Sequence, residues 1–471
     1  MSMAETWANH EIDLHLELAG PRVRAGLETA LRDAVRAGRL RPGARLPATR
    51  ALAADLGIAR NTVADAYGQL VAEGWLTART GSGTWVTQHP APARGAPGSD
   101  QPDLTHPRYD LRPGVPDLSA FPRRAWLAAE RKALSATPDH VLGYPDPRGL
   151  PQLRLALADY LARARGVTAS PGRIVVCAGF AQGLALLGQV LRARGATTIA
   201  TEACGHPGHR LIAQAHGLRL TSLPVDAGGA VPDGLSTGGR GAADAVLLTP
   251  AHQFPLGVTL RPQRRRAIVE WAVDTGGLVI EDDYDGEFRY DRQPVGAMQA
   301  LAPEHVVYAG TASKSLMPGL RLGWLVLPAP LVGEVVAAKE AAGGLTGSLD
   351  QLTLAEFISS GGYDRQIRHA RLAYRRRRDR LVTALRLQVP HARVTGIAAG
   401  LHALVQLAGP DSEDDVTARA ARHGLAVEGL GHYRAAGQYA PALVIGYARP
   451  PEHGFTTALA RLCAALTGAP S

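Results

Sequence analysis

Apolar residues near the start of the chain recur at helical spacing. The first helix is predicted from a stripe at four-residue intervals, made of Val23, Leu27, Leu31 and Val35. A shorter helix is predicted over residues 49–56, with Leu52 and Leu56 inward and Gly57 placed to end it. A third helix is indicated by the i, i+3, i+4, i+7, i+8 set of Val63, Ala66, Tyr67, Leu70 and Val71.

Two short extended segments follow these helices. Residues 75–79 and 84–87 flank a glycine-containing tetrapeptide, residues 80–83, which predicts a hairpin. Three helices followed by a hairpin are the layout of a winged helix-turn-helix, predicted here for residues 15–88. In that layout, the first residues of the third helix face base edges in the major groove of DNA.

The pattern changes after this segment. Residues 89–109 are rich in proline, glycine and alanine and have no periodic apolar face, so we interpret them as a linker. Beyond it, short apolar runs alternate with helical patterns, which is typical of α/β proteins. The runs 173–177, 245–248 and 278–280 are expected to be parallel strands buried on both faces.

Composition narrows the class of protein. A chain of 471 residues is expected to form two or three units, and 46% hydrophobic and 20% charged residues indicate a folded globular protein. The formal charge of +9 is compatible with a polyanionic partner but does not require one. The three cysteines are widely spaced, which argues against a zinc site or a disulfide framework. With no signal pattern in residues 1–20 and no apolar run of membrane-spanning length, we expect a cytoplasmic protein that does not contact a membrane.

The first segment carries residue types that read DNA. It contains ten arginines and five acidic residues between positions 21 and 86, and no lysine. Arg60 and Asn61 are suited to guanine and adenine, and Thr62 is suited to phosphate or a thymine methyl group. Arg79 beside the flexible tip, which includes Ser82 and Gly83, suits contact with the DNA backbone or minor groove. The alternative is a small helical domain for protein contacts with a solvated arginine face.

The stretch from Leu46 to Val86 closely resembles GntR-type winged helices. The resemblance implies that the residues facing DNA are Arg45, Arg50, Arg60, Asn61, Thr62 and the wing with Arg79, Ser82 and Gly83. One departure is Ala59, where a serine commonly caps the recognition helix. Loss of such a cap costs about 1 kcal/mol of helix stability.

A lysine in the large segment lies among phosphate-binding residue types. Lys314 stands between two serines after an apolar strand, and Arg321 follows seven residues later. Pyridoxal 5'-phosphate (PLP) needs an amine for a Schiff base, and hydroxyls and a guanidinium for its phosphate. Lys314 is therefore the candidate amine, with Thr311, Ser313 and Arg321 for the phosphate. A solvated surface lysine is the alternative, and the chain has only two other lysines, Lys132 and Lys339.

Another apolar strand ends in carboxylates. The run 278–290 reads LVIEDDYDGEFRY, and ligands bind at the carboxyl ends of such strands. A carboxylate there can pair with the pyridine nitrogen of PLP, and Tyr284 can bind the phenolic oxygen of the ring. The alternative is a magnesium site formed by Glu281, Asp282 and Asp283. The strand-to-helix turn at residues 179–182 presents main-chain amides that suit a phosphate.

Together these segments resemble fold-type I aminotransferases, and specifically their MocR/GabR-like regulatory relatives. The runs 111–126 and 143–167 are typical of that group. The resemblance implies an aminotransferase-like domain over residues 110–471, with a mostly parallel sheet and a small α+β subdomain from about 345 to 471. It also implies a homodimer, promoter DNA as a partner and PLP as the cofactor, with no metal.

The resemblance assigns roles to individual residues. Lys314 would form the Schiff base, Asp282 would face the pyridine nitrogen and Tyr284 the phenolic oxygen. The phosphate would be bound by Thr311, Ser313 and Arg321 together with the amides near Gly179, Phe180 and Ala181. Tyr144 would reach the phosphate of the partner subunit, and His252 and Gln253 would lie next to the cofactor ring. His206 replaces a tyrosine that commonly stacks on this ring.

Two departures bear on the effector. Arginines that grip a substrate carboxylate in relatives are replaced here by Pro207 and Gly208 and by Val444, and Arg449 lies five residues further on. We therefore expect a regulator that senses PLP itself and controls genes of PLP synthesis or salvage. The alternatives are a PLP-dependent aminotransferase with residual half-transamination, a GabR-like sensor of an amine, and a structural DNA-bending protein. The arginine runs 264–266 and 375–378 are interpreted as solvated helix faces or, less favoured, as extra DNA contacts.

Overall fold

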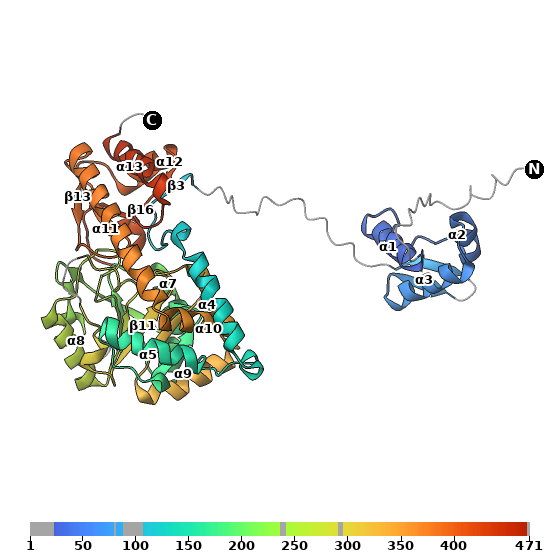
Figure 1. The fold of residues 1–471 in the computed structure, drawn as a ribbon. Helices are drawn as coiled ribbons and strands as arrows, with labels where there is room; N and C mark the ends of the chain where they lie inside the picture. Colours follow the sequence, from blue (N-terminus) through green and yellow to red (C-terminus); the bar gives the residue numbers. More distant parts are fainter. Residues whose placement is uncertain (1–22, 80–81, 88–106, 236–241, 291–294, 469–471) are drawn as a thin grey trace, which may run out of the picture. The chain divides into compact units, whose positions relative to one another are not determined.

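A computed structural model of the chain describes residues 23–79, 82–87, 107–235, 242–290 and 295–468. The chain divides into two compact units on either side of residue 105 (Figure 1). The predicted linker lies mostly outside the described residues. Its last position, Tyr109, is part of a strand of the second unit.

The first unit confirms the expected helices and hairpin. Its elements are α1 (Val23–Arg36), α2 (Thr49–Leu56), α3 (Arg60–Ala72), β1 (Leu76–Arg79) and β2 (Gly83–Val86). Leu27, Leu31, Leu52 and Leu70 are among the buried residues of one core cluster. Val23 is 43% exposed and does not belong to the buried stripe, in contrast to the expectation.

The second unit is built on a sheet of seven strands. Their order is β4 (Ile174–Cys177), β12 (Gly323–Val326), β11 (Val306–Thr311), β10 (Leu278–Asp282), β9 (Ala245–Leu248), β5 (Thr198–Glu202) and β6 (Arg219–Leu223). Only β12 runs against its neighbours β11 and β4. The strands expected in runs 173–177, 245–248 and 278–280 are β4, β9 and β10. The parallel pairing is confirmed for β9 and β10, but it is wrong for β4, which lies at the edge of the sheet and pairs with β12 in the antiparallel sense.

Helices cover both faces of this sheet, which explains the continuous apolar runs. One core cluster contains residues of α6 (Phe180–Ala193), α7 (Pro207–Ala215) and α9 (Ala329–Ala341). Residues of α5 (Pro151–Arg165) and α8 (Pro262–Thr275) belong to two other clusters. The strand residues in these clusters alternate along each strand with those of the first cluster, so their side chains point to the opposite face of the sheet. In β4, for example, Val175 belongs to the first cluster and Val176 to that of α5.

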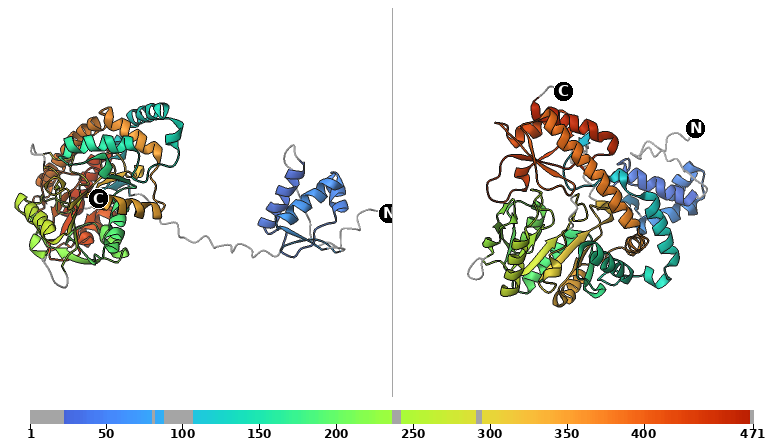
Figure 2. Two further views of the ribbon diagram at one scale, coloured as in Figure 1. Left: turned by 90° about the horizontal axis from the view of Figure 1, so that it is seen from below. Right: turned by 60° about the vertical axis from the view of Figure 1, so that its left-hand side comes forward.

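The C-terminal layer begins with the long helix α11 (Gly362–Gln388), drawn in orange in Figures 1 and 2. The preceding α10 (Ser348–Ser359) packs against α4 (Arg123–Ala136) and α5, although the predicted small subdomain starts near residue 345. The layer contains the sheet β13 (Arg393–Thr395), β14 (Ala403–Gln406), β17 (Ala442–Ile445) and β16 (Glu428–Gly429), with helices α12 (Glu413–Arg422) and α13 (Glu452–Thr467). Two further pairs are β3 (Tyr109–Asp110) with β15 (Leu425–Ala426), and β7 (Val225–Asp226) with β8 (Gly229–Ala230).

The two arginine runs are not uniformly solvated. Arg265 is 8% exposed and donates to three main-chain carbonyls. Arg377 is buried and lies 2.7 Å from the carboxylate of Asp117. Both interpretations of the runs are therefore wrong for these two side chains, which stabilise the fold. Within the described ranges, no helix combines the length and apolar character needed to cross a membrane.

Candidate functional site

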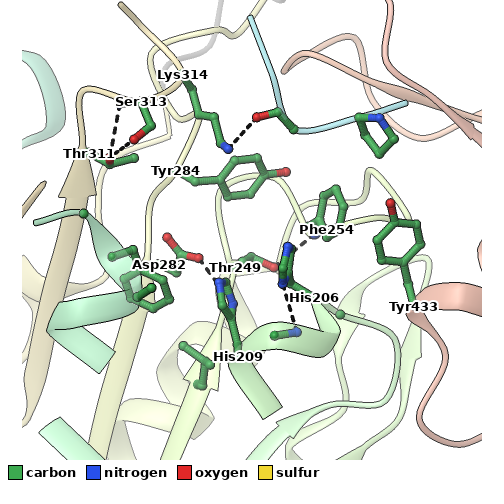
Figure 3. A pocket seen from close by; sticks show the side chains of 18 of the residues that line it. His206, His209, Thr249, Phe254, Asp282, Tyr284, Thr311, Ser313, Lys314 and Tyr433 are labelled. Atoms are coloured by element: carbon green, nitrogen blue, oxygen red, sulfur yellow. Dashed lines mark hydrogen bonds and ion pairs between the residues drawn. The ribbon is translucent and has the colours of Figure 1, made fainter. Parts of the chain in front are cut away.

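A cavity of about 580 Å³ lies at the carboxyl ends of the parallel strands in the second unit. Its wall includes the ends of β5, β9, β10 and β11, the start of α6, and part of the C-terminal layer. Figure 3 shows Lys314 and Tyr284 on one side of this space, and His206 and His209 facing them. The sequence places the members of this wall up to 320 residues apart, from Pro113 to Tyr433.

Lys314 presents its amine inside this cavity. Its Nζ donates to the carbonyl of Gly114 at 2.6 Å. Burial lowers the pKa of the amine, although the carboxylates of Asp282 and Asp285 act in the opposite direction. A lowered pKa increases the fraction of free amine, which is the form that attacks an aldehyde.

The other two lysines are engaged elsewhere. Lys132 pairs with Glu356 at 2.7 Å on the surface. Lys339 is 1% exposed, and its Nζ donates to the carbonyls of Pro147 and Val176. Neither lines the cavity, so Lys314 is the one lysine of the chain with an amine available there.

The three carboxylates at the end of β10 point in different directions. Glu281 accepts from the main-chain amides of Met298 and Gln299. Asp283 is held by the guanidinium of Arg165, with Nε–Oδ2 2.6 Å, and by the hydroxyl of Tyr308. Only Asp282 lines the cavity. The geometry does not support the magnesium alternative, because the three groups do not converge on one point.

The buried carboxyl group of Asp282 would be stabilised by a positively charged partner. Burial raises its pKa well above the ordinary value, and Lys314 only partly opposes this. Its Oδ2 lies 4.0 Å from Nδ1 of His209. Burial, with His206 as a further cause, lowers the pKa of His209 to about 3, so this ring is neutral. A protonated ring nitrogen placed against Asp282 would supply the missing positive charge.

An anion cradle lies between β4 and α6. Gly179 precedes the 14-residue helix α6 with φ +84°, and a side chain added to it would lie 3.5 Å from Nη1 of Arg321. Arg321 itself has φ +50°, the one non-glycine residue in the left-handed region among those described. Such a conformation costs about 1 kcal/mol or more and is common in ligand clamps. Arg321 has no carboxylate partner in the described part of the chain.

Two hydroxyls complete the cradle. Thr311 Oγ1 lies 2.9 Å from Ser313 Oγ and accepts from the Ser313 amide. Phe180 and Ala181 occupy the first helical positions of α6, where unpaired amides and the helix dipole favour an anion. PLP needs a site for its phosphate, an amine to react with its aldehyde and a carboxylate for its ring nitrogen, and the residues present fit all three.

Not every predicted residue reaches the cavity. Tyr284 and His206 line it, whereas His252 does not. The imidazole of His252 is 2% exposed and lies behind Tyr284, whose hydroxyl donates to the His252 carbonyl at 3.0 Å. The neighbouring Phe254 lines the cavity instead. The side chain of Tyr144 is 97% exposed and does not line the cavity of its own chain.

Sequence reasoning missed several members of the wall. Glu202 accepts two hydrogen bonds from Thr249, and burial raises its pKa to about 7. Arg210 donates from Nη1 to the carbonyls of Gly205 and Tyr433. Glu202 and Arg210 flank His206 in the sequence, which is the signal that points to them. His402 comes from the C-terminal layer, and no local pattern indicates it.

In the first unit, the residues predicted to face DNA lie on the surface. Arg45, Arg50, Arg60, Asn61, Arg79, Ser82 and Gly83 are exposed, and Thr62 is half-buried. Ala59 provides no side-chain cap to α3, as its sequence implies. On the hairpin, the guanidinium groups of Arg45 and Arg79 each lie 5.7 Å from the ring of Trp85. Such cation–π contacts hold the two charges at the wing.

Both units match known families. Residues 24–86 match the bacterial regulatory proteins of the gntR family. Residues 111–431 match the aminotransferase class I and II family.

Relatives carry both units in one chain. The pyridoxine biosynthesis transcriptional regulator PdxR of Corynebacterium glutamicum is 33% identical over 444 residues, covering 94% of this chain and 95% of the relative. This chain belongs to the MocR-type transcriptional regulators. The probable rhizopine catabolism regulatory protein MocR of Rhizobium meliloti is 34% identical over 376 residues, or 76% of each chain.

Solved structures match the second unit. An archaeal alanine:glyoxylate aminotransferase has a TM-score of 0.70 at 25% identity, covering 76% of this chain and 91% of that one. The α-aminoadipate aminotransferase LysN of Thermus thermophilus has a TM-score of 0.68 at 24% identity, with 76% and 92% covered, which shows the fold alone. This MocR-type regulator therefore has the aminotransferase fold expected from its sequence.

The positions expected to lack a carboxylate clamp do so. Gly208 lines the cavity without a side chain, and Val444 is buried in β17. Arg449 pairs with Asp110 at 2.8 Å. Arg210 is therefore the one arginine besides Arg321 among the residues that form the cavity wall.

Proposed function

We propose that this regulator binds promoter DNA through its first unit, binds PLP at Lys314 in its second unit, and responds to PLP itself. Genes of PLP synthesis or salvage are the targets that fit such a sensor. The observation that carries the proposal is the composition of the cavity wall. It offers an amine, a ring-facing carboxylate and an anion cradle, whereas Gly208 and Val444 stand where relatives place carboxylate-binding arginines.

Physical chemistry favours this assignment of the effector. A desolvated carboxylate needs a paired cation, because burying it without one is expensive. The contacts for the aldehyde, the ring and the phosphate of PLP are present, and Arg449 is committed to Asp110. The relative named as a regulator of pyridoxine biosynthesis, which this chain matches over 94% of its length, adds support.

We further propose that the protein acts as a homodimer. The ring of Tyr144 is 97% exposed in the single chain, which is unusual for a large aromatic side chain. Contact with the phosphate site of the partner subunit would cover it.

One observation favours a second candidate, a sensor of an amino acid or amine that acts together with PLP. Arg210 lines the cavity, and among the described residues only its Nη1 has hydrogen-bond partners, both main-chain carbonyls. A ligand carboxylate would find a cation there. Residual half-transamination of the bound amino acid or amine is compatible with this second candidate.

The two candidates differ in what releases or strengthens DNA binding. The test uses protein freed of PLP and the operator that the protein selects from a random duplex library. PLP alone is expected to change the affinity for this operator, and added amino acids and amines are expected to change it no further. A response that requires an amino acid or amine, and is lost in Arg210→Gln, would favour the second candidate.

A further inference from the structure

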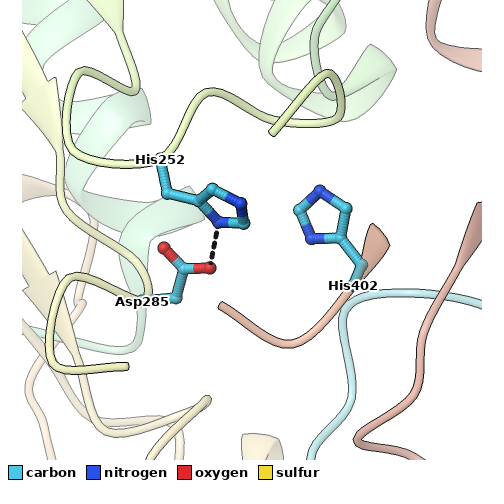
Figure 4. Close-up of side chains that lie close together, drawn as sticks. All are labelled: His252, Asp285 and His402. Carbon is cyan, nitrogen blue, oxygen red and sulfur yellow. Dashed lines mark hydrogen bonds and ion pairs between the residues drawn. The ribbon is translucent and has the colours of Figure 1, made fainter. Parts of the chain in front are cut away.

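Figure 4 shows a buried pair of polar side chains, His252 and Asp285. Neither is part of the cavity wall, and the ring of His252 lies 6.4 Å from that of Tyr284. His252 Nδ1 is 2.7 Å from Asp285 Oδ2, and the side chains are 2% and 1% exposed. Burying such groups is costly, and nothing in the binding of PLP described above uses either of them. The cost of burying this pair therefore indicates a role that the binding of PLP alone does not explain.

The hydrogen bond determines which ring nitrogen of His252 carries a proton. Because the carboxylate of Asp285 accepts, Nδ1 is the donor. His252 Nε2 is buried without a hydrogen-bond partner among the described residues. An unpaired lone pair is tolerated in the interior more often than an unpaired N–H group, so the proton belongs on Nδ1 alone.

This proton position restricts the hydroxyl of Tyr284. Its Oη lies 3.3 Å from His252 Nδ1 and 3.0 Å from the His252 carbonyl oxygen. Since Nδ1 already carries hydrogen, it cannot accept a hydrogen bond from the hydroxyl. The hydroxyl must donate elsewhere, to the His252 carbonyl, to the carboxylate of Asp285 or to an acceptor in the cavity.

Hydrogen bonding explains the cluster better than a metal ion does. His402 completes a group of three possible ligands, and its ring lies 4.9 Å from that of His252. However, two donors on one tetrahedral zinc lie about 3.3 Å apart, well beyond the 2.7 Å between His252 and Asp285. His402 Nε2 is 3.2 Å from the Pro255 carbonyl, and burial lowers the pKa of His402 well below its usual range. His402 is therefore a neutral neighbour.

We propose that His252 and Asp285 are positioning residues that hold Tyr284 as a hydrogen-bond donor to the phenolic oxygen of PLP. The inference rests on the proposed binding of PLP at Lys314. A donor at the phenolic oxygen stabilises its anion and makes it less basic. The proton that this oxygen shares with the nitrogen of the lysine linkage is then released at lower pH.

Other groups act on the same region and stay unchanged in the test. Besides Asp285, the carboxylates of Asp282 and Glu202 act on the hydroxyl of Tyr284, and Asp282 also acts on Lys314. His206 and His209 of α7 lie across the cavity. A shift seen only when the pair is altered is therefore attributable to the pair.

The test follows the absorbance of bound PLP as a function of pH in the full-length protein. The quantity compared is the pH midpoint of the absorbance change. Tyr284→Phe removes the hydrogen-bond donor and is expected to give the largest upward shift of this midpoint. His252→Gln, which leaves the charge of Asp285 in place, is expected to raise the midpoint by at least half of that shift. Asp285→Asn also removes a negative charge that raises the pKa of Lys314, so its upward shift is expected to be smaller. The double variant His252→Gln/Tyr284→Phe should match Tyr284→Phe alone, because His252 acts through the hydroxyl.

Asp117→Asn is the matched control, since Asp117 belongs to a buried ion pair with Arg377 away from the cavity wall. It should leave the midpoint unchanged. An unaltered midpoint in both folded pair variants, or an additive shift in the double variant, would overturn the positioning role. If the wild-type protein shows no lysine-linked absorbance with PLP, the proposed cofactor site fails instead, so the two failures are distinguishable.

Discussion

The two binding regions of this chain are built in opposite ways. Residues predicted to face DNA lie between positions 45 and 83 and are almost all exposed. The cavity gathers residues from 113 to 433, and many of its polar groups are buried with shifted pKa values. Exposed arginines are free to serve binding without a folding cost. Buried polar groups contribute both to ligand binding and to the stability of the fold. Substitutions in the cavity are therefore expected to alter stability and binding together.

The largest expected effect is at Lys314. Lys314→Ala should abolish the covalent adduct that borohydride traps between PLP and the protein, because no other amine lines the cavity. The adduct is measured by mass spectrometry of peptides. Lys132→Ala, which alters a surface lysine, should leave it intact. An adduct that persists on Lys132 or Lys339 would contradict the assignment of the cavity.

The buried ion pair beneath the site gives the next effect. Arg165→Met leaves the carboxylate of Asp283 buried without its cation and should lower the free energy of unfolding by roughly 3–5 kcal/mol. Two residues away on α5, the exposed Arg163 pairs with Asp364, and Arg163→Met should cost less than about 1 kcal/mol. Denaturant unfolding of the two variants measures the contrast. Equal losses would show that burial does not decide the cost.

Glu202 links the cavity to pH. Its pKa is raised to about 7 in the folded protein, so its contribution to stability is present at acidic pH and is lost as pH rises through 7. The raised pKa corresponds to roughly 3 kcal/mol at most. Thermal stability of the second unit should therefore fall as the pH rises from about 4.5 to about 7, and Glu202→Gln should flatten that fall. If the thermal stability of Glu202→Gln fell with pH as steeply as that of the wild type, Glu202 would not be the group that causes the fall.

Arg60 tests the exposed region. Arg60→Ala should weaken operator binding by roughly 1–3 kcal/mol and relax preference at one base pair. It should leave the unfolding free energy almost unchanged, because the side chain is exposed. Fluorescence anisotropy with operator variants measures the effect, with Arg24→Ala on α1 as the control. An equal loss on every sequence would make Arg60 a phosphate contact.

The same contrast explains what the sequence could predict. Helical stripes and a glycine turn are local, so α1 to α3 and the hairpin were predictable from residues 23–87. The roles of Lys314, Asp282 and Arg321 could be proposed from short motifs that resemble a known family. Which face a side chain presents was harder to predict. His252 and Phe254 are two residues apart in one turn, and only Phe254 lines the cavity.

Contacts between distant segments could not be predicted. His402 lies in the C-terminal layer and meets His252 only in the folded chain. Arg265 and Arg377 belong to basic runs that read as solvated, yet both are buried because carbonyls or a carboxylate surround them. The positions of charged residues along the sequence do not indicate which groups will surround them in the folded chain.

We propose that the binding of PLP in the cavity and the binding of DNA by the first unit are coupled. Linkage requires the coupling to be reciprocal, so the two affinities must change by one common factor. The direct measurement is the affinity for PLP, followed by absorbance, in the absence and presence of saturating operator DNA. We predict that the operator changes the PLP affinity by the same factor by which PLP changes the operator affinity. Equal PLP affinities with and without the operator would show that the two binding events are independent.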